Sequence, residues 1–116
     1  MRDGRTMDDL STPKGTYEHL DEITLVDCRE PHEWEAGRVD GAVHIPLSDI
    51  MASGGTDLDR SKPVVVICRS GNRSELAAMM FQARGFEAHN LEGGMEAWVS
   101  DGLPIAAPDG SPGRVA

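Results

Sequence analysis

The chain has 116 residues, close to the commonest size of a single domain, so a second independent domain is not expected. Apolar residues make up 39% of the sequence and charged residues 27%, which is typical of a soluble globular protein. The 11 Lys and Arg residues against 20 Asp and Glu residues give a net charge of −9. This charge opposes binding to phosphate backbones and anionic lipids, so neither a nucleic acid nor a membrane is an expected partner.

Apolar patterning and cysteine usage narrow the class further. The longest apolar runs have about five residues, far fewer than a membrane-spanning helix requires, and residues 1–5 lead into acids rather than an apolar signal core. We therefore expect a cytoplasmic protein. The two cysteines, Cys28 and Cys68, form no Cys-x-x-Cys motif, and the four histidines show no ligand spacing. A disulfide framework, a metal site and a bound cofactor are accordingly not predicted.

Glycine and proline divide the chain into three parts. Residues 1–15 are polar and are expected to be a flexible N-terminal segment or a first short strand. Residues 105–116 contain further glycines and prolines and are expected to be a flexible tail. The body, residues 16–104, shows no internal repeat and no low-complexity tract, so a repeat protein is excluded.

Short apolar runs recur through the body in the order expected of an α/β domain. Strands are predicted over residues 23–26, 42–45, 64–68 and 86–91. The run at 64–68 has no polar alternation, which suits a strand buried on both faces of a parallel sheet. It is therefore predicted to be the central strand.

A helix is predicted between the third and fourth strands. Four apolar residues recur there with helical spacing: Leu76, Ala77, Met80 and Phe81. Ser74 can cap or enter the first turn, and Gly85 offers a C-terminal stop. Met79 is assigned to the core on the same helix.

A second helix is predicted around Trp98. Gly93 and Gly94 lack the residues that complete a phosphate loop, so they predict a backbone turn before this helix and no nucleotide site. Trp34 and Trp98 are interpreted as packing anchors.

The loop after the central strand carries the candidate chemistry. Cys68 lies at the carboxyl end of that strand, where ligands of open α/β sheets gather. The loop leads into a helix N-terminus, whose free N–H groups and dipole favour a thiolate over a thiol. Gly71 lets the backbone turn so that N–H groups converge on the sulfur. A lowered pKa is therefore predicted for Cys68, the candidate catalytic nucleophile.

The residues after Cys68 are the candidate substrate-binding residues: Arg69, Ser70, Gly71, Asn72 and Arg73. The two arginines place permanent cations beside the cysteine, and a guanidinium matches an oxyanion well. Asn72 tolerates the dihedral angles that a sharp turn requires. These features favour attack by a thiolate on a small anionic electrophile. The Cys-x4-Arg spacing gives a narrower cradle than a Cys-x5-Arg loop, which has room for a phosphate, so a single sulfur atom is the expected cargo.

Four blocks of sequence, in order, resemble the single-domain rhodanese family. Residues 26–30 resemble the family's Asp-x-Arg strand end, and residues 37–46 resemble its Gly-His-Ile-x-Gly-Ala block and the Ile-Pro that follows. Residues 68–74 are similar to its active loop. Residues 91–104, from Leu-Glu-Gly-Gly to Gly-Leu-Pro, form the fourth block. The likeness therefore covers nearly the whole body of the chain.

The resemblance implies a rhodanese-like α/β fold, with about five parallel strands and helices on both faces. It also implies a thiosulfate sulfurtransferase, in which Cys68 takes a sulfane sulfur from thiosulfate or another persulfide donor. The Cys68 persulfide would pass this sulfur to a thiophilic acceptor such as cyanide or a thiol. Arg38 stands where the family usually has His, and Cys28 stands where it usually has an aliphatic residue. These departures concern local packing more than activity.

Two other functions stay open at this point. The chain could be a noncatalytic or sulfur-delivery module that docks a sulfur-relay protein, with the cysteine receiving sulfur from that partner. A cysteine-dependent phosphatase or arsenate reductase on a related scaffold is disfavoured by the length of the loop. The physiological donor and acceptor do not follow from the sequence.

The end of the first predicted strand is expected to be structural. Asp27 and Arg29 are interpreted as an ion pair or hydrogen-bonded pair that supports the sheet, because a preformed thiolate needs no separate general base. Cys28 is interpreted as a buried packing residue, with a redox partnership to Cys68 as the alternative.

Overall fold

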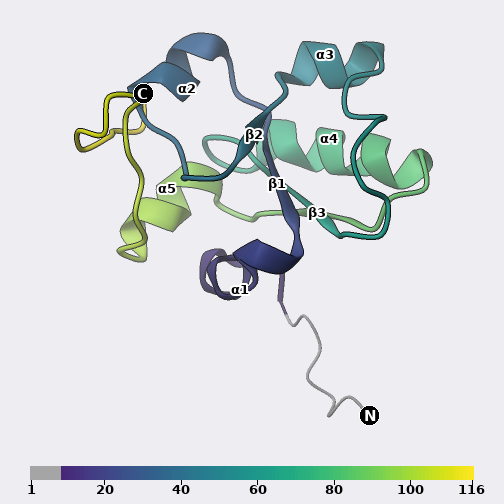
Figure 1. The fold of residues 1–116 in the computed structure, drawn as a ribbon, viewed down its shortest axis with the longest axis horizontal. Helices are drawn as coiled ribbons and strands as arrows, with labels where there is room; N and C mark the ends of the chain where they lie inside the picture. Colours follow the sequence, from purple (N-terminus) through teal and green to yellow (C-terminus); the bar gives the residue numbers. More distant parts are fainter. Residues whose placement is uncertain (1–8) are drawn as a thin grey trace.

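The computed structural model describes residues 9–116, which form one sheet with helices on both faces (Figure 1). The strands are β1 (Thr24–Asp27), β2 (Val43–His44), β3 (Val64–Ile67) and β4 (Ala88–Asn90). Their spatial order is β2-β1-β3-β4, and all three pairings are parallel. The predicted α/β class is confirmed, with four strands in the described part of the chain instead of about five.

The helices connect these strands and cover the sheet. They are α1 (Pro13–Glu18), the 3-10 helix η1 (Leu20–Glu22), α2 (Pro31–Ala36), α3 (Leu47–Ala52), α4 (Asn72–Ala83) and α5 (Gly94–Ser100). Figure 1 shows α3 and α4 together beside the sheet, with α1 and α5 in another part of the molecule. No helix within residues 9–116 is long and apolar enough to cross a bilayer.

The core has two parts because successive side chains of a strand point to opposite faces of the sheet. On one face, Val26, Val64 and Val66 pack with Ile50 of α3 and with Phe81 of α4. On the other face, residues of β1 and β3 pack with α5 and with the start of the described chain: Leu25, Val65, Ile67, Met95, Trp98 and Leu10. All four residues of β3 are fully buried, and β3 lies between β1 and β4, as expected for the central strand.

The described part of residues 1–15 forms a turn and the start of a helix. The Thr12 hydroxyl accepts a hydrogen bond from the Gly15 amide at 3.1 Å, and Pro13 occupies the first helical position of α1. Residues 9–15 therefore contain no strand, and α1 crosses the boundary expected at residue 16. The rest of the expected N-terminal segment, residues 1–8, lies outside the described residues.

Residues 105–116 pack against the body, in contrast to the flexible tail expected from their composition. Ala106 forms antiparallel bridges with Arg38 and Pro112. The Arg114 amide donates to the Ala36 carbonyl at 2.9 Å, and Val115 packs against the buried cluster that contains Trp98. Backbone pairing thus orders a segment whose glycines and prolines suggested a loose end.

Helix α4 buries most of the predicted apolar face, because Ala77 and Phe81 are fully buried and Met80 packs against the same cluster. Leu76, the fourth residue of that face, is 41% exposed, and Met79 is 59% exposed, so assigning Met79 to the core was wrong. The buried residues of α4 are Ser74, Ala77, Ala78 and Phe81. Three of these four are small, which lets the first turns of the helix lie close to the sheet. The helix ends before Gly85, whose φ of +92° confirms its role as a stop.

Candidate active site

Cys68 follows β3 directly, and its sulfur lies under the first turn of α4. The Sγ atom accepts hydrogen bonds from the Gly71 amide at 3.1 Å, the Ser74 amide at 3.3 Å and the Ser74 hydroxyl at 3.2 Å. Gly71 adopts a φ of +106°, which an L side chain rarely accepts, and this turns its N–H toward the sulfur. The predicted convergence of amides on Cys68 is therefore present in the structure.

Helix α5 holds the same loop from the other side. The Met95 amide donates to the Cys68 carbonyl at 2.7 Å, and the Glu96 amide donates to the Arg69 carbonyl at 3.0 Å. A Cβ atom on Gly94 would lie 2.2 Å from the Cys68 carbonyl oxygen, so only glycine allows this approach. The predicted turn at Gly93 and Gly94 thus has a second role, because it brings the amides of α5 onto the loop.

Asn90 is a neighbour of the site that sequence reasoning missed. Its Oδ1 atom shares the single proton of the Ser74 hydroxyl with the Cys68 sulfur, and its Nδ2 atom donates to the Gly71 carbonyl at 3.2 Å. Asn90 ends β4 and pairs in register with Val66 of β3. A polar residue that ends a strand beside the central strand was the signal that could have identified it.

The surroundings of Cys68 favour its thiolate. A hydrogen bond from the Cys28 side chain is the largest cause, followed in the same direction by the bonds from Ser74 and Gly71, and burial acts against them. Together they lower the pKa of Cys68 to about 4 from an ordinary value of 9.0. The sulfur is therefore an anion at neutral pH although the residue is only 1% exposed.

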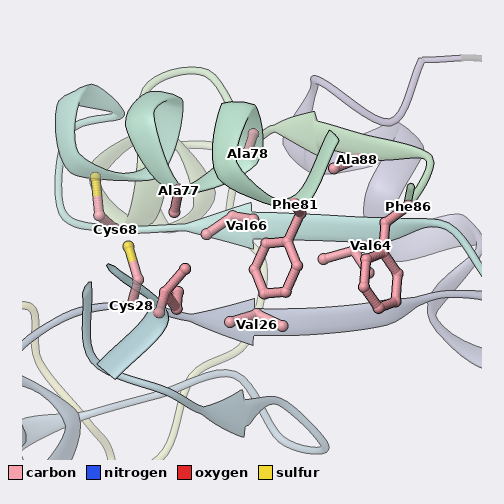
Figure 2. Close-up of a cluster of buried hydrophobic side chains, with 11 residues drawn as sticks. Val26, Cys28, Val64, Val66, Cys68, Ala77, Ala78, Phe81, Phe86 and Ala88 are labelled. Carbon is pink, nitrogen blue, oxygen red and sulfur yellow. The ribbon is translucent and has the colours of Figure 1, made fainter. Parts of the chain in front are cut away.

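Cys28 has the opposite character. Its pKa is raised strongly, first by its hydrogen bond with Cys68, then by burial and by the negative charges of Cys68 and Asp27. The side chain belongs to the same buried cluster as Cys68 and is fully buried (Figure 2). Cys28 thus remains a neutral thiol beside a thiolate.

Arg73 is held in an ion pair, which changes the role predicted for it. Its two terminal nitrogens donate to the two carboxylate oxygens of Glu33 at 2.7 and 2.9 Å. The Arg73 guanidinium lowers the pKa of Glu33 to about 2, and the carboxylate in turn raises the pKa of Arg73. Glu33 also accepts a hydrogen bond from the Glu30 amide as part of the capping box of α2. The positive charge that was expected to bind a substrate anion is therefore paired with a carboxylate, and two of the five N–H donors of the guanidinium are occupied.

The other candidate residues of the loop are on the surface. The Arg69 Nε atom donates to Glu96 at 3.0 Å, and the two side chains are 52% and 53% exposed. Ser70 and Asn72 are exposed as well. Among the candidate residues, the structure thus brings Gly71 to the sulfur, while both arginines bind carboxylates.

The strand end beside Cys68 is closed by a buried charge pair. Arg29 donates to both carboxylate oxygens of Asp27, with the shortest contact at 2.8 Å, and both side chains are fully buried. Arg29 also donates to the Gly37 carbonyl at 2.7 Å, which links β1 to the end of α2. The prediction that this pair supports the fold is confirmed.

The tryptophans and Arg38 form packing contacts. Trp98 is fully buried, and its indole N–H donates to the Pro104 carbonyl at 3.0 Å. Trp34 stacks on His44, with a centroid distance of 4.6 Å, and the Arg38 guanidinium lies 4.4 Å from the Trp34 ring centre. Arg38 therefore packs through a cation–π contact at the position where the resemblance led us to expect histidine.

Comparison with known proteins agrees with this architecture. The family model described as Rhodanese-like domain matches residues 8–101. A protein of Allochromatium vinosum named Sulfurtransferase is 35% identical over 91 residues, which cover 78% of this chain and 84% of that protein. Bacillus subtilis YtwF, whose name assigns it provisionally to the sulfurtransferases, is 42% identical over 91 residues and covers 78% of this chain and 87% of its own length.

Solved structures show the same fold. The crystal structure of a rhodanese-related protein from Thermoplasma volcanium matches with a TM-score of 0.76 and 32% identity, covering 82% of this chain and 94% of that chain. A rhodanese-like domain protein from Staphylococcus aureus matches with a TM-score of 0.67 and 29% identity over 75% and 87% of the two chains. By sequence and by structure, this chain belongs to the rhodanese family.

Proposed function

We propose that the chain is a sulfurtransferase that carries a sulfane sulfur as a persulfide on Cys68. The observation that carries this proposal is the set of hydrogen bonds from Gly71 and Ser74 to the Cys68 sulfur. These donors keep the sulfur anionic at the end of a rigid strand, and a thiolate is the form of cysteine that attacks sulfur. The names of two relatives, given above, point to the same activity.

The proposed reaction has two steps. In the first, the Cys68 thiolate attacks the outer sulfur of thiosulfate, a new S–S bond forms on Cys68, and sulfite leaves with the electron pair of the broken S–S bond. In the second, a nucleophilic acceptor such as cyanide or a thiolate attacks the outer sulfur of the persulfide. The bond to Cys68 breaks, and its electron pair returns to the Cys68 sulfur as a thiolate.

The charges around the loop favour a second candidate function, sulfur delivery from a protein or thiol persulfide. Arg73 is bound by Glu33 and Arg69 by Glu96, so two carboxylates balance the two guanidinium groups nearest Cys68. A doubly charged thiosulfate ion gains little from such a site, whereas a persulfide donor carries less charge. A Bacillus subtilis relative named for a sulfur carrier role, YrkF, is 35% identical over 66% of this chain, although the match spans 42% of that protein.

The experiment that tests the proposal is a thiocyanate assay with two donors. We expect the wild-type protein to form thiocyanate from cyanide with thiosulfate, with a persulfide-loaded cysteine desulfurase, or with both, and Cys68→Ala to form none above background. Turnover with the protein donor alone would support delivery over thiosulfate chemistry. Turnover of an aryl phosphate without thiocyanate from either donor would contradict a sulfurtransferase and favour the phosphatase alternative.

A further inference from the structure

Cys28 and Cys68 occupy matching positions at the ends of the neighbouring strands β1 and β3. In the parallel pairing of β1 with β3, Asp27 is opposite Ile67, so the next positions along the two strands are the two cysteines. The Cys28 amide donates to the Ile67 carbonyl at 3.0 Å, which extends the pairing to this point. Backbones of neighbouring strands are about 4.8 Å apart, so register-matched side chains on the same face lie in contact. Figure 2 shows the Cys28 sulfur pointing toward Cys68, on the same side of the sheet as Ala77 and Phe81.

The Cys28 and Cys68 side chains lie in the same buried cluster, and hydrogen bonding between them is the largest influence on the pKa of both thiols. The Cys28 side chain is fully buried in an apolar cluster, where an unpaired donor would be costly. The charged groups that act on it are Asp27 of its own strand and Arg73 of α4. Arg29 binds Asp27, and Glu33 of α2 binds Arg73, so both neighbouring charges have other partners. The two cysteines together therefore carry one negative charge, which resides on Cys68, while Cys28 keeps its proton.

We propose that Cys28 is a positioning residue whose thiol donates a hydrogen bond to Cys68 and thereby favours release of sulfur from the Cys68 persulfide. This inference rests on the proposed function. It assigns a chemical role to a side chain that sequence reasoning interpreted as packing, with a redox role as the alternative. Cys28 forms no covalent bond and keeps its proton throughout, so its role requires no oxidant or reductant.

The direction of the effect follows from where the charge lies in each state. In the free enzyme the charge is on the Cys68 Sγ atom, beside Cys28. In the persulfide it lies on the outer sulfur, one S–S bond of about 2.05 Å further along. The Cys28 donor therefore stabilises the free thiolate more than the persulfide. Cys68 becomes a better leaving group when an acceptor attacks the outer sulfur, and a slightly weaker nucleophile when it attacks a donor.

The test measures the two half-reactions separately in Cys28→Ala and Cys28→Ser. Loading is followed by intact mass after mixing with thiosulfate or a persulfide donor, and release is followed as thiocyanate formed from the loaded protein with cyanide. We expect release from Cys28→Ala to be roughly three- to tenfold slower, because a leaving thiol of higher pKa leaves more slowly, and loading to be equal or up to about threefold faster, because the rate of attack rises with thiolate basicity with a slope of about 0.4–0.5. Cys28→Ser keeps a donor of similar size and should release sulfur within about twofold of the wild-type rate.

A packing role would give a different result, in which loading and release fall together and serine does not restore either. That result, or equal release from all three proteins, would overturn the inference. Alkylation of Cys68 by iodoacetamide as a function of pH gives a readout that does not depend on sulfur transfer. The pH at which the alkylation rate falls on acidification should be higher in Cys28→Ala than in the wild-type protein, and nearly unchanged in Cys28→Ser. An unchanged pH in Cys28→Ala would contradict the inference even if no donor loads the protein.

Discussion

Two neighbouring strands, β1 and β3, are each followed by the dipeptide Cys-Arg, and the two dipeptides lie in different environments. Cys28 and Arg29 follow β1, and Cys68 and Arg69 follow β3. The Arg29 side chain is fully buried against Asp27, whereas the Arg69 side chain is 52% exposed beside Glu96. The same residue type thus forms a buried ion pair after one strand and an exposed ion pair after its neighbour.

The cysteines differ in the same way. Backbone amides of Gly71 and Ser74 reach the Cys68 sulfur because α4 begins there, whereas the charge pair of Asp27 and Arg29 closes the end of β1. Backbone N–H groups stabilise an anion without neutralising it, so the thiolate keeps its charge for reaction. The segment that follows a strand, more than the residue that ends it, decides whether that residue becomes reactive.

The largest expected effect comes from breaking the buried pair. Arg29→Ala leaves the Asp27 carboxylate buried without its partner, so we expect the free energy of unfolding to fall by about 3–5 kcal/mol. Arg69→Ala is the matched control at the other strand end and should lower it by less than about 1 kcal/mol. Urea denaturation measures both, and similar losses in the two variants would contradict the contrast.

A smaller effect is expected from the turn that aims the amides. Gly71→Ala forces an L side chain to adopt a φ of +106°, which should cost about 1–3 kcal/mol of stability and withdraw an amide from the sulfur, lowering the rate of sulfur transfer roughly tenfold or more. Gly102→Ala, with a φ of +79° and open space around its Cα, is the control for backbone strain. It should lose similar stability and keep its activity. Equal loss of activity in both variants would show that strain, and not the site, is responsible.

The stability of the fold should depend on the charge of Cys68. Its pKa is about 4 in the folded chain and near 9.0 for an ordinary thiol, so between these values the unfolded chain holds a proton that the folded chain lacks. Stability from this source is therefore present above pH 9 and is lost as the pH falls toward 4. The difference in unfolding free energy between the wild-type protein and Cys68→Ala should grow from pH 5 to pH 8. Its slope should not exceed about 1.4 kcal/mol per pH unit, the value reached when the unfolded chain holds one full proton more than the folded chain.

Urea denaturation of the two proteins at three pH values checks this dependence. If the difference in unfolding free energy between the two proteins stayed constant from pH 5 to pH 8, Cys68 would not be a thiolate in the folded state.

The smallest effect is expected at the exposed ion pair. Glu96→Gln frees the Arg69 guanidinium and removes a negative charge beside the loop, so the KM for thiosulfate should fall roughly two- to fivefold, the equivalent of one surface ion pair. Glu87→Gln makes the same change of net charge at an exposed residue paired with His89 and should leave KM unchanged. The difference between the two variants should shrink in high salt. An unchanged KM in Glu96→Gln would show that Arg69 does not bind the donor.

Much of the fold could be predicted because the sequence signals were local. The apolar runs around β1 and β3 predicted buried strands, and Gly71 predicted the turn that brings amides onto Cys68. Cys68 was proposed as the nucleophile because it follows the central strand and because its loop resembles that of a known family. On α4, periodicity predicted the buried Ala77 and Phe81 correctly, but it missed Ala78 and placed the exposed Leu76 on the apolar face.

The rest of the site depends on contacts between residues distant in sequence. Arg73 and Glu33 are forty positions apart, and only the packing of α2 beside the loop pairs them. Asn90 reaches the loop through the register of β4 with β3, and Cys28 reaches Cys68 through the register of β1 with β3. Register and helix packing are tertiary properties, so the sequence pointed to Cys68 and to the Gly71 turn without identifying the contributions of Asn90, Cys28 and Glu33.

Intact-mass spectrometry of the wild-type protein and Cys68→Ala after treatment with thiosulfate or a persulfide donor tests the central claim most directly. The account predicts a gain of one sulfur atom on the wild-type protein, removable by cyanide, and no gain on Cys68→Ala. An equal gain on both proteins, or no gain on the wild-type protein with either donor, would contradict the assignment of Cys68 as the sulfur carrier.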